Sequence, residues 1–197
     1  YEIMPSLVGS EMCIRDSPAE LEYRLLQALH RGGLPVPEPL LVDTSGGLLG
    51  DPFLVTGFIE GTSDVPAARA GQYIEGMADL LAKVHAFPTA DLPTLPVRND
   101  PLPEVFEYLP EGNEWENLRA HLRSLRDTAY LESPKLLHGD FWPENLLWQD
   151  GAVTALLDWE DSAIGDPLSD VAVSRVELRY KFGQVGMQRF TQAYARQ

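Results

Sequence analysis

The spacing of apolar positions along the chain predicts several amphipathic helices. Apolar residues recur every three or four positions within 19–31 and again within 67–87, which is typical of helices with one buried face. The Gly32-Gly33 pair predicts the end of the first helix. A third helix is predicted over 113–131. A last helix is predicted to start at Asp166-Pro167, with Asp as N-cap and Pro as the first helical residue, and to run to the end of the chain.

Short apolar runs bounded by turn residues predict two β-hairpins. Residues 39–59 contain two such runs around a Ser- and Gly-rich turn. Further along, 136–138 and 145–148 each read as a strand, the QDG at 149–151 reads as a tight turn, and 152–158 reads as the returning strand. Residues 88–112 are rich in proline and are predicted to be irregular. The pattern therefore indicates a mixed α+β fold.

The segment LLHGDFWPENLLWQD at 136–150 places His138, Asp140, Glu144 and Asn145 between apolar runs. Asp140 and Asn145 are five apart, and the predicted hairpin returns Asp158 beside Asn145. This spacing follows the template for phosphoryl transfer, an Asp-x-x-x-x-Asn loop and then a magnesium-binding Asp. A hydroxyl nucleophile needs a carboxylate that orients it and accepts its proton. Magnesium, which neutralises phosphate charge, prefers oxygen ligands such as those of Asn and Asp.

HGDFWPEN at 138–145, together with LLDWEDSAIGDPLSD at 156–170, resembles the aminoglycoside phosphotransferase and choline kinase superfamily. The resemblance covers about 18–197. It implies a protein-kinase-like α+β fold, mostly the helical C-lobe with a remnant of the N-lobe sheet and its helix. It also implies transfer of the γ-phosphoryl group of ATP, or of GTP, to a hydroxyl with the help of Mg²⁺. Asp140 would then be the catalytic base, and Asn145 and Asp158 would bind magnesium.

The same resemblance implies supporting roles for other residues. His138, Asp166 and Asp170 would brace the catalytic loop, and His85 reads as a core or capping histidine. The backbone groups of Gly57 and Ile59, in the VTGFIEG linker between lobes, would hold adenine. Glu22 would be the helix glutamate that pairs with a strand lysine near the phosphates.

The sequence departs from the family pattern before Glu22. No glycine-rich phosphate loop precedes it, and the lysines are Lys83, Lys135 and Lys181. EMCIRDS at 11–17 matches the translation of a transposon end used in sequencing libraries, so 1–17 is expected to be a non-native junction sequence. We then expect 18–62 to be an N-lobe remnant and linker and 63–197 an incomplete C-lobe. The chain would be truncated at both ends and weak or inactive.

The acceptor is expected to be a small molecule and not a protein. Gly165-Asp166-Pro167 arrives seven to nine residues after Asp158, which leaves no room for a protein-kinase activation segment. Gly139 also stands where protein kinases have Arg. Acidic and aromatic side chains could line a mouth for an aminoglycoside-like, choline-like or sugar acceptor, or the aromatics could pack in the core and the acids be solvated. These residues are Phe141, Trp142, Glu144, Trp159, Glu160 and Asp161.

The composition of the chain limits which partners and which cellular location are expected. The net charge is −15, from 30 acidic and 15 basic residues, so nucleic acid is not an expected partner. No run approaches the ~18 apolar residues of a membrane span. A single cysteine, Cys13, excludes an intrachain disulfide and fits a reducing, cytoplasmic location. Two alternatives stay open: a non-catalytic kinase-like binding module, and a metal-dependent hydrolase that uses His138, Asp140 and Glu144.

Overall fold

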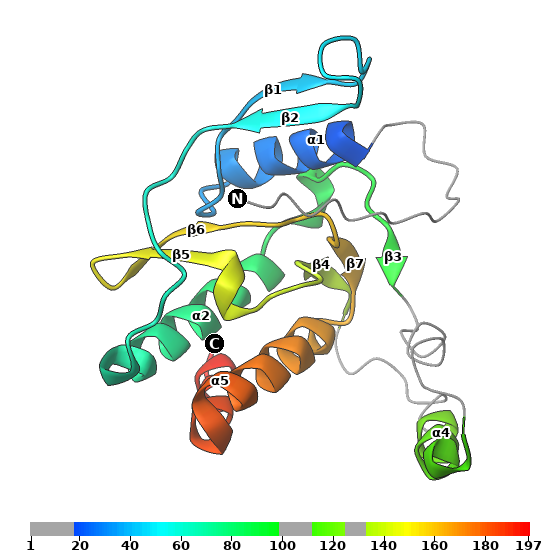
Figure 1. The fold of residues 1–197 in the computed structure, drawn as a ribbon, viewed down its shortest axis with the longest axis vertical. Helices are drawn as coiled ribbons and strands as arrows, with labels where there is room; N and C mark the ends of the chain where they lie inside the picture. Colours follow the sequence, from blue (N-terminus) through cyan, green and yellow to red (C-terminus); the bar gives the residue numbers. More distant parts are fainter. Residues whose placement is uncertain (1–17, 99–111, 125–132) are drawn as a thin grey trace.

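A computed structural model describes residues 18–98, 112–124 and 133–197 of the chain (Figure 1). The expected junction sequence at 1–17 therefore lies outside the described residues. Three of the four α-helices in these ranges, together with three small sheets, enclose an apolar core. The core includes Leu25, Leu29, Met77, Leu81, Leu136, Leu146, Leu156 and Phe190.

Helix α1 (Pro18–Arg31) and the hairpin of β1 (Pro39–Asp43) and β2 (Phe53–Thr56) form the N-terminal part. The helix buries Leu25, Leu26 and Leu29, as its apolar spacing predicts. The chain turns away just after Arg31 at Gly33, whose φ of 82° lets the Leu34 amide bond the Leu29 carbonyl at 3.1 Å. The two strands pair antiparallel, which confirms the predicted hairpin, and they lie against α1 (Figure 1).

A second hairpin joins β5 (Leu146–Gln149) to β6 (Ala152–Leu156), as predicted. Asn145 is not part of the strand but ends a 3-10 turn, Pro143–Asn145. The segment that leaves β2 crosses this hairpin, where Thr62 and Trp148 exchange backbone hydrogen bonds of 3.0 and 2.9 Å. A β-carbon on Gly61 would lie 2.9 Å from the Leu147 β-carbon, so the linker lies directly on β5.

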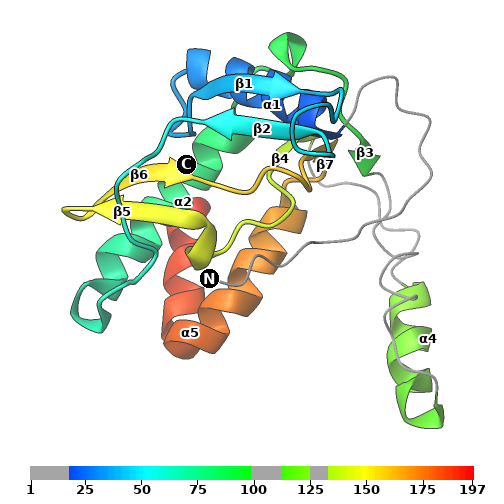
Figure 2. The same cartoon turned by 45° about the horizontal axis from the view of Figure 1, so that its top comes forward.

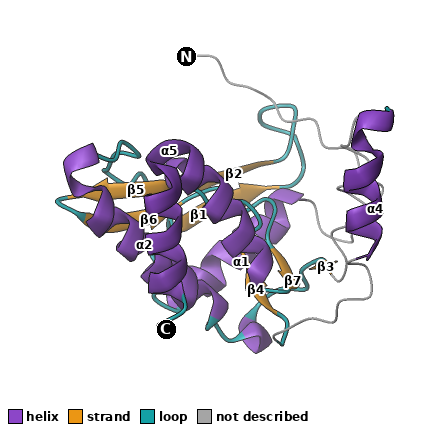
Figure 3. Ribbon diagram, turned by 90° about the horizontal axis from the view of Figure 1, so that it is seen from below, coloured by secondary structure: helices purple, strands orange, loops and turns teal. Residues whose placement is uncertain are grey.

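Two long helices pack below the second hairpin, as seen from below in Figure 3. A 3-10 turn (Ala67–Arg69) leads into α2 (Ala70–His85), which confirms the helix predicted over 67–87. Helix α5 spans Leu168–Tyr194 but breaks at Gly183, whose φ of 70° and ψ of −171° are not helical. Arg175 Nη1 bonds Thr191 Oγ1 at 2.9 Å across the break, so the second half folds back beside the first. Figure 2 shows this return in orange and red.

The third sheet was not predicted in full. It consists of β3 (Val97–Arg98), β7 (Ala163–Gly165) and β4 (Lys135–Leu137), in the order β3-β7-β4. Strand β4 ends at Leu137, so the expectation that His138 closes this strand is wrong. Strands of two or three residues have no readable period, because alternation needs several positions.

The segment between α2 and β4 is described in part. A 3-10 turn (Thr89–Asp91) and β3 interrupt the stretch that was predicted to be irregular. Helix α4 (Glu116–Ser124), preceded by a 3-10 turn (Asn113–Trp115), confirms part of the helix predicted over 113–131. The remainder of that prediction lies outside the described residues. None of the helices in the described ranges has the length and apolar content to cross a bilayer.

Candidate active site

The start of the 138–145 loop is held by one buried carboxylate. Asp170, in the first turn of α5, is completely buried. Its Oδ2 accepts a hydrogen bond from the His138 amide at 2.8 Å, and its Oδ1 accepts one from the Gly139 amide at 2.9 Å. Hydrogen bonds to an ionised acceptor are stronger than neutral ones. Asp170 therefore fixes the backbone that leads directly into Asp140.

Gly139 allows the loop to lie on the segment that follows Asp158. Its φ is 90°, and a β-carbon at this position would overlap the backbone carbonyl of Asp161. Only glycine satisfies both conditions. The residue that differs from the protein-kinase pattern is thus required by the close approach of two backbones.

His138 is fully buried and connects the loop to the second hairpin. Its Nε2 lies 2.9 Å from the Leu157 carbonyl, which only accepts, and its Nδ1 lies 3.3 Å from the Asp140 amide, which only donates. These partners fit the neutral ring with its proton on Nε2. Burial lowers the pKa of His138 below its ordinary value, although the nearby carboxylate of Asp170 acts in the opposite direction. The ring is therefore a neutral structural link.

Asn145 joins the predicted catalytic carboxylate to the returning strand. Its Nδ2 donates to the Asp140 carbonyl at 2.9 Å and to Asp140 Oδ2 at 3.1 Å. Its own carbonyl accepts from the Leu157 amide at 2.8 Å. The next residue, Asp158, is exposed and has a φ of 63°, an uncommon conformation for a side chain other than glycine. Asp140, Asn145 and Asp158 are therefore brought together, as their spacing predicts.

Glu22 of α1 faces the same region from the N-terminal part. Burial raises its pKa, and the negative charges of Asp158 and Glu160 raise it further. In the part of the chain that the structure describes, no Lys or Arg forms an ion pair with Glu22. The lysine partner that the family pattern implies is thus not supplied by the described residues.

The predicted substrate mouth needs a correction for its aromatic residues. Trp159 is 1% exposed, its indole N–H donates to the Leu156 carbonyl at 3.1 Å, and its ring lies 4.7 Å from the His138 ring. Phe141 is fully buried as well. Both belong to the core, so neither can stack on a substrate. Trp142 is half-buried and stays a candidate.

The acidic residues of the mouth are all exposed. Glu144 pairs with Lys181 of α5, and Asp161 lies 3.2 Å from Arg98 of β3. Glu160 has a raised pKa, caused by burial and then by the charges of Asp158, Asp161 and Asp140. The rim of the site is therefore negative around Asp140 and Asp158, with two of its acids paired to bases.

The remaining predicted positions divide into three cases. Asp166 accepts from the Leu168 amide at 2.9 Å, but the N-cap of α5 is Pro167, so the expected start of this helix is one residue too early. Among the described residues, no hydrogen bond or ion pair joins the Asp166 side chain to the 138–145 loop. The Gly57 amide already donates to the Glu38 carbonyl at 2.8 Å, so it is not free for adenine. The Gly57 carbonyl and the backbone of Ile59 remain the candidate groups.

The side chains at the site fit a magnesium ion held by Asn145 and Asp158 better than a hydrolase metal site of His138, Asp140 and Glu144. The Asn145 amide nitrogen is used by Asp140, so its Oδ1 remains for a ligand, and the Asn145 backbone bonds the residue before Asp158. Magnesium is usually held by one or two protein oxygens plus phosphates and water. No group of three or more His, Cys, Asp or Glu residues in the described ranges could hold a metal. The proposed cluster of His138, Asp140 and Glu144 does not form, since His138 and Glu144 have other partners.

Two residues that hold the site were missed or understated in the sequence. His85 of α2 lies 3.1 Å from Asp170, and Ser174 donates to the Phe141 carbonyl at 2.8 Å. The partners of His85 are 85 residues or more away, so no local pattern reveals them.

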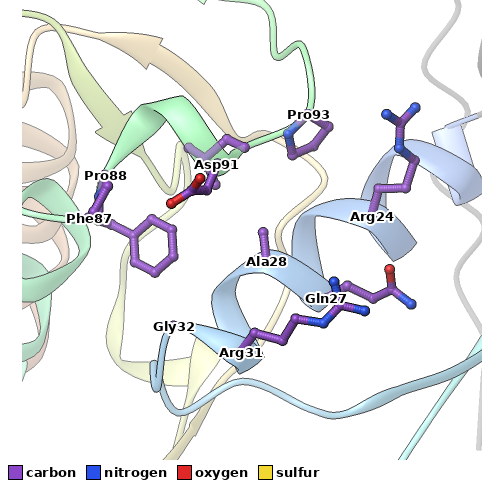
Figure 4. A pocket seen from close by; sticks show the side chains of 10 residues that line it. Arg24, Gln27, Ala28, Arg31, Gly32, Phe87, Pro88, Asp91 and Pro93 are labelled. Atoms are coloured by element: carbon purple, nitrogen blue, oxygen red, sulfur yellow. The ribbon is translucent and has the colours of Figure 1, made fainter.

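A cavity of about 660 Å³ lies elsewhere, on the face of α1 that carries Arg24, Gln27 and Arg31 (Figure 4). None of the predicted site residues lines it.

Comparisons with known proteins give the family. Residues 14–197 match the model of the phosphotransferase enzyme family. Mouse acyl-CoA dehydrogenase family member 10 is 28% identical over 174 residues, which cover 79% of this chain and 16% of that protein. Aminoglycoside 3′-phosphotransferase of Streptomyces fradiae is 28% identical over 192 residues, or 86% of this chain and 69% of that protein.

The fold is also that of solved phosphotransferases. The GDP and kanamycin complex of APH(2″)-IIia has a TM-score of 0.68 at 20% identity and covers 91% of this chain and 68% of that chain. The predicted protein-kinase-like α+β fold is thereby confirmed. The chain spans 16% to 22% of the acyl-CoA dehydrogenase family members that it matches. With a match over residues 14–197, the chain belongs to the phosphotransferase enzyme family.

Proposed function

We propose that this chain carries the site of a small-molecule kinase that transfers the γ-phosphoryl group of ATP, or of GTP, to a hydroxyl group. The observation that carries the proposal is the arrangement of Asp140, Asn145 and Asp158. Asn145 bonds Asp140 through its side chain and receives the Leu157 amide through its backbone, directly before Asp158. Phosphoryl transfer requires a base and magnesium ligands close together, and Asp140, Asn145 and Asp158 would supply them.

Asp140 would orient the acceptor hydroxyl and take its proton. A carboxylate can do this only if it is ionised and held in position. The loop backbone on its N-terminal side is held by Asp170, and its Oδ2 is held by Asn145. The second carboxylate oxygen would then face the substrate. Much of the catalytic contribution would come from this fixed geometry.

Magnesium and the nucleotide would lie between the two parts of the chain. Asn145 Oδ1 and the Asp158 carboxylate would hold the ion, which when bound neutralises phosphate charge. The Gly57 carbonyl and the backbone of Ile59 would receive the base, because this linker runs across β5 and β6. The GDP complex of a structurally similar protein supports a nucleotide in this fold.

The acceptor would be a small, positively charged molecule such as an aminoglycoside-like, choline-like or amino-sugar compound. The exposed acids Glu144, Glu160 and Asp161 surround the site. Burial raises the pKa of Glu160, and the negative charges of Asp158, Asp161 and Asp140 raise it further. A cation entering the mouth would relieve that repulsion. The name of the Streptomyces fradiae relative supports the same class of acceptor. Trp142 is the aromatic residue that would contact it.

We propose that this 197-residue chain transfers the phosphoryl group slowly. Glu22 faces Asp158 and Glu160 with no basic partner among the described residues, so the phosphates would lack one positive contact. This observation also supports the second candidate function, a kinase-like module that binds nucleotide without catalysis. Either protein would work in the cytoplasm, where ATP is available, and neither would need nucleic acid or a membrane.

The decisive experiment compares Asp140→Asn with Asp150→Asn. Asp150 lies exposed in the turn of the same hairpin, and its φ of 55° is a conformation that Asn tolerates. Both substitutions remove one negative charge, so Asp150→Asn is a matched control. Phosphoryl transfer from ATP with magnesium to kanamycin, choline and simple sugars is followed by mass spectrometry. We expect Asp140→Asn to lower kcat by about 10²–10⁴, because general base catalysis contributes that much, and Asp150→Asn to leave it unchanged.

The same samples separate the two candidate functions. If the wild-type chain binds nucleotide by calorimetry but modifies no acceptor, the binding module is supported. Equal activity of Asp140→Asn and wild type would contradict the role of Asp140. Binding of neither ATP nor GTP would contradict both functions.

A further inference from the structure

The carboxylate that holds the catalytic loop is itself held by a buried histidine. His85, at the C-terminal end of α2, is 4% exposed, and its Nε2 lies 3.1 Å from Asp170 Oδ2. The same Oδ2 accepts the His138 amide. A carboxylate with two amide donors is acceptor-only, so His85 donates its Nε2 proton to it. His85 is thus one contact away from the loop that presents Asp140.

The other nitrogen of His85 meets a tyrosine from the end of the chain. Tyr194 Oη lies 2.7 Å from His85 Nδ1, and the two rings meet edge to face at 5.7 Å. Nε2 donates to Asp170, so the second ring nitrogen is the one that the Tyr194 hydroxyl holds. With a hydrogen bond at each nitrogen, the His85 ring is fixed in the orientation in which Nε2 faces Asp170.

The fold delivers Tyr194 to this place by the break in α5. The chain turns back at Gly183, and the second half of the helix then lies along α2. Phe190 is buried in the core, and Arg189 pairs with Glu75 of α2 at 3.1 Å. The hydroxyl of Tyr194 is therefore placed by packing along a whole helical segment and not by a mobile side chain alone.

We propose that Tyr194 is a positioning residue for the reaction, acting through His85 and Asp170 on the backbone before Asp140. The proposal rests on the function proposed above. Loss of the hydroxyl would remove the hydrogen bond at His85 Nδ1, and the His85 ring and the Asp170 carboxylate would then relax. The amides of His138 and Gly139, and with them Asp140, would lose part of their fixed position. Small displacements of a catalytic group reduce kcat more than they reduce binding.

The test is Tyr194→Phe, which keeps the ring and its stacking on Phe190 and removes the hydroxyl. The matched control is Tyr180→Phe, since Tyr180 is on the same helix and 91% exposed. We expect kcat to fall about fivefold in Tyr194→Phe, the effect of one net hydrogen bond, with the KM for nucleotide within about twofold. Tyr180→Phe should match the wild-type chain in both constants.

A second readout does not depend on activity. Nitrogen-15 NMR of the 197-residue chain reports the tautomer of His85 and the amides of His138 and Gly139. In Tyr194→Phe we expect the His85 Nδ1 resonance and both amide resonances to shift, with no such shift in Tyr180→Phe. If these resonances stay in place, the proposal is overturned whether or not the chain phosphorylates any acceptor.

A double-mutant cycle shows whether the effect passes through His85. His85→Gln keeps a side-chain N–H that can donate to Asp170 but has no Nδ1. In that background Tyr194→Phe should change kcat by less than about 1.5-fold, because coupled residues are not additive. A full, additive loss would overturn the proposed route, as would an unchanged kcat in Tyr194→Phe itself. If the resonances shift but the wild-type chain transfers no phosphoryl group, the network stands and the proposed function fails.

Discussion

At the scale of single residues, Gly139 is the position where sequence and tertiary contact depend most closely on each other. It combines a φ of 90° with a site where a β-carbon would overlap the Asp161 carbonyl. Gly33 is a matched control, since its φ is 82° and no atom lies within 4 Å of its β-carbon position. We expect Gly33→Ala to cost about 1–2 kcal/mol from backbone conformation alone. Gly139→Ala should cost about 1–3 kcal/mol more, because it also overpacks the contact. Urea unfolding measures both, and equal losses would contradict the close approach.

At the scale of elements, the break in α5 decides which residues reach the catalytic loop. Gly183 has a φ of 70° and a ψ of −171°, a region that is almost closed to other residues. Its β-carbon position is open, so a substitution tests the backbone conformation without a clash. We expect Gly183→Ala to lower the free energy of unfolding by about 1–3 kcal/mol. Gln184→Ala, at the exposed neighbouring position, should stay within about 0.5 kcal/mol of wild type. An unchanged stability of Gly183→Ala would show that α5 tolerates a continuous helix.

At the scale of the whole molecule, a chain with a net charge of −15 brings Glu22, Asp158 and Glu160 near one another. The pKa of Glu22 is raised above its ordinary 4.5, so between these values the folded chain binds more protons than the unfolded chain. Its contribution to stability therefore falls as the pH rises through that window. We expect Glu22→Gln to unfold at a higher denaturant concentration than wild type at pH 7, and the difference to shrink toward pH 4.5. Glu38→Gln, which makes the same charge change at an exposed site, is the control, and an identical gain there would indicate only net charge.

His138, the buried histidine of the loop, changes the stability with pH in the opposite direction. The pKa of His138 is lowered from its ordinary 6.5, so between these values the unfolded chain binds more protons than the folded one. Its contribution to stability is complete above pH 6.5 and is lost as the pH falls. His138 is present in both proteins. Its contribution therefore cancels when the free energies of unfolding of Glu22→Gln and wild type are subtracted at each pH.

The local elements and the residue types of the loop can be predicted from neighbouring residues alone. Helical spacing in 19–31 and 67–87 and the two hairpins need only neighbouring residues, because a 3.6-residue or 2-residue period is a local property. The five-residue spacing of Asp140 and Asn145, and the short hairpin that returns Asp158, are local for the same reason. These features indicated a mixed α+β fold, and the resemblance of 138–145 and 156–170 to the aminoglycoside phosphotransferase and choline kinase superfamily implied the protein-kinase-like one.

The residues that support the loop, in contrast, are revealed by contacts between distant parts of the chain. Aromatic residues near a loop look alike in sequence, and packing on His138 is what assigns Trp159 to the core. The short strands β3 and β7 exist because distant backbone groups pair with them. His85 lies 109 residues from Tyr194 and 85 from Asp170, so their contacts carry no periodic signal. Such hydrogen bonds depend on the packing of α2 against α5, which no local pattern records.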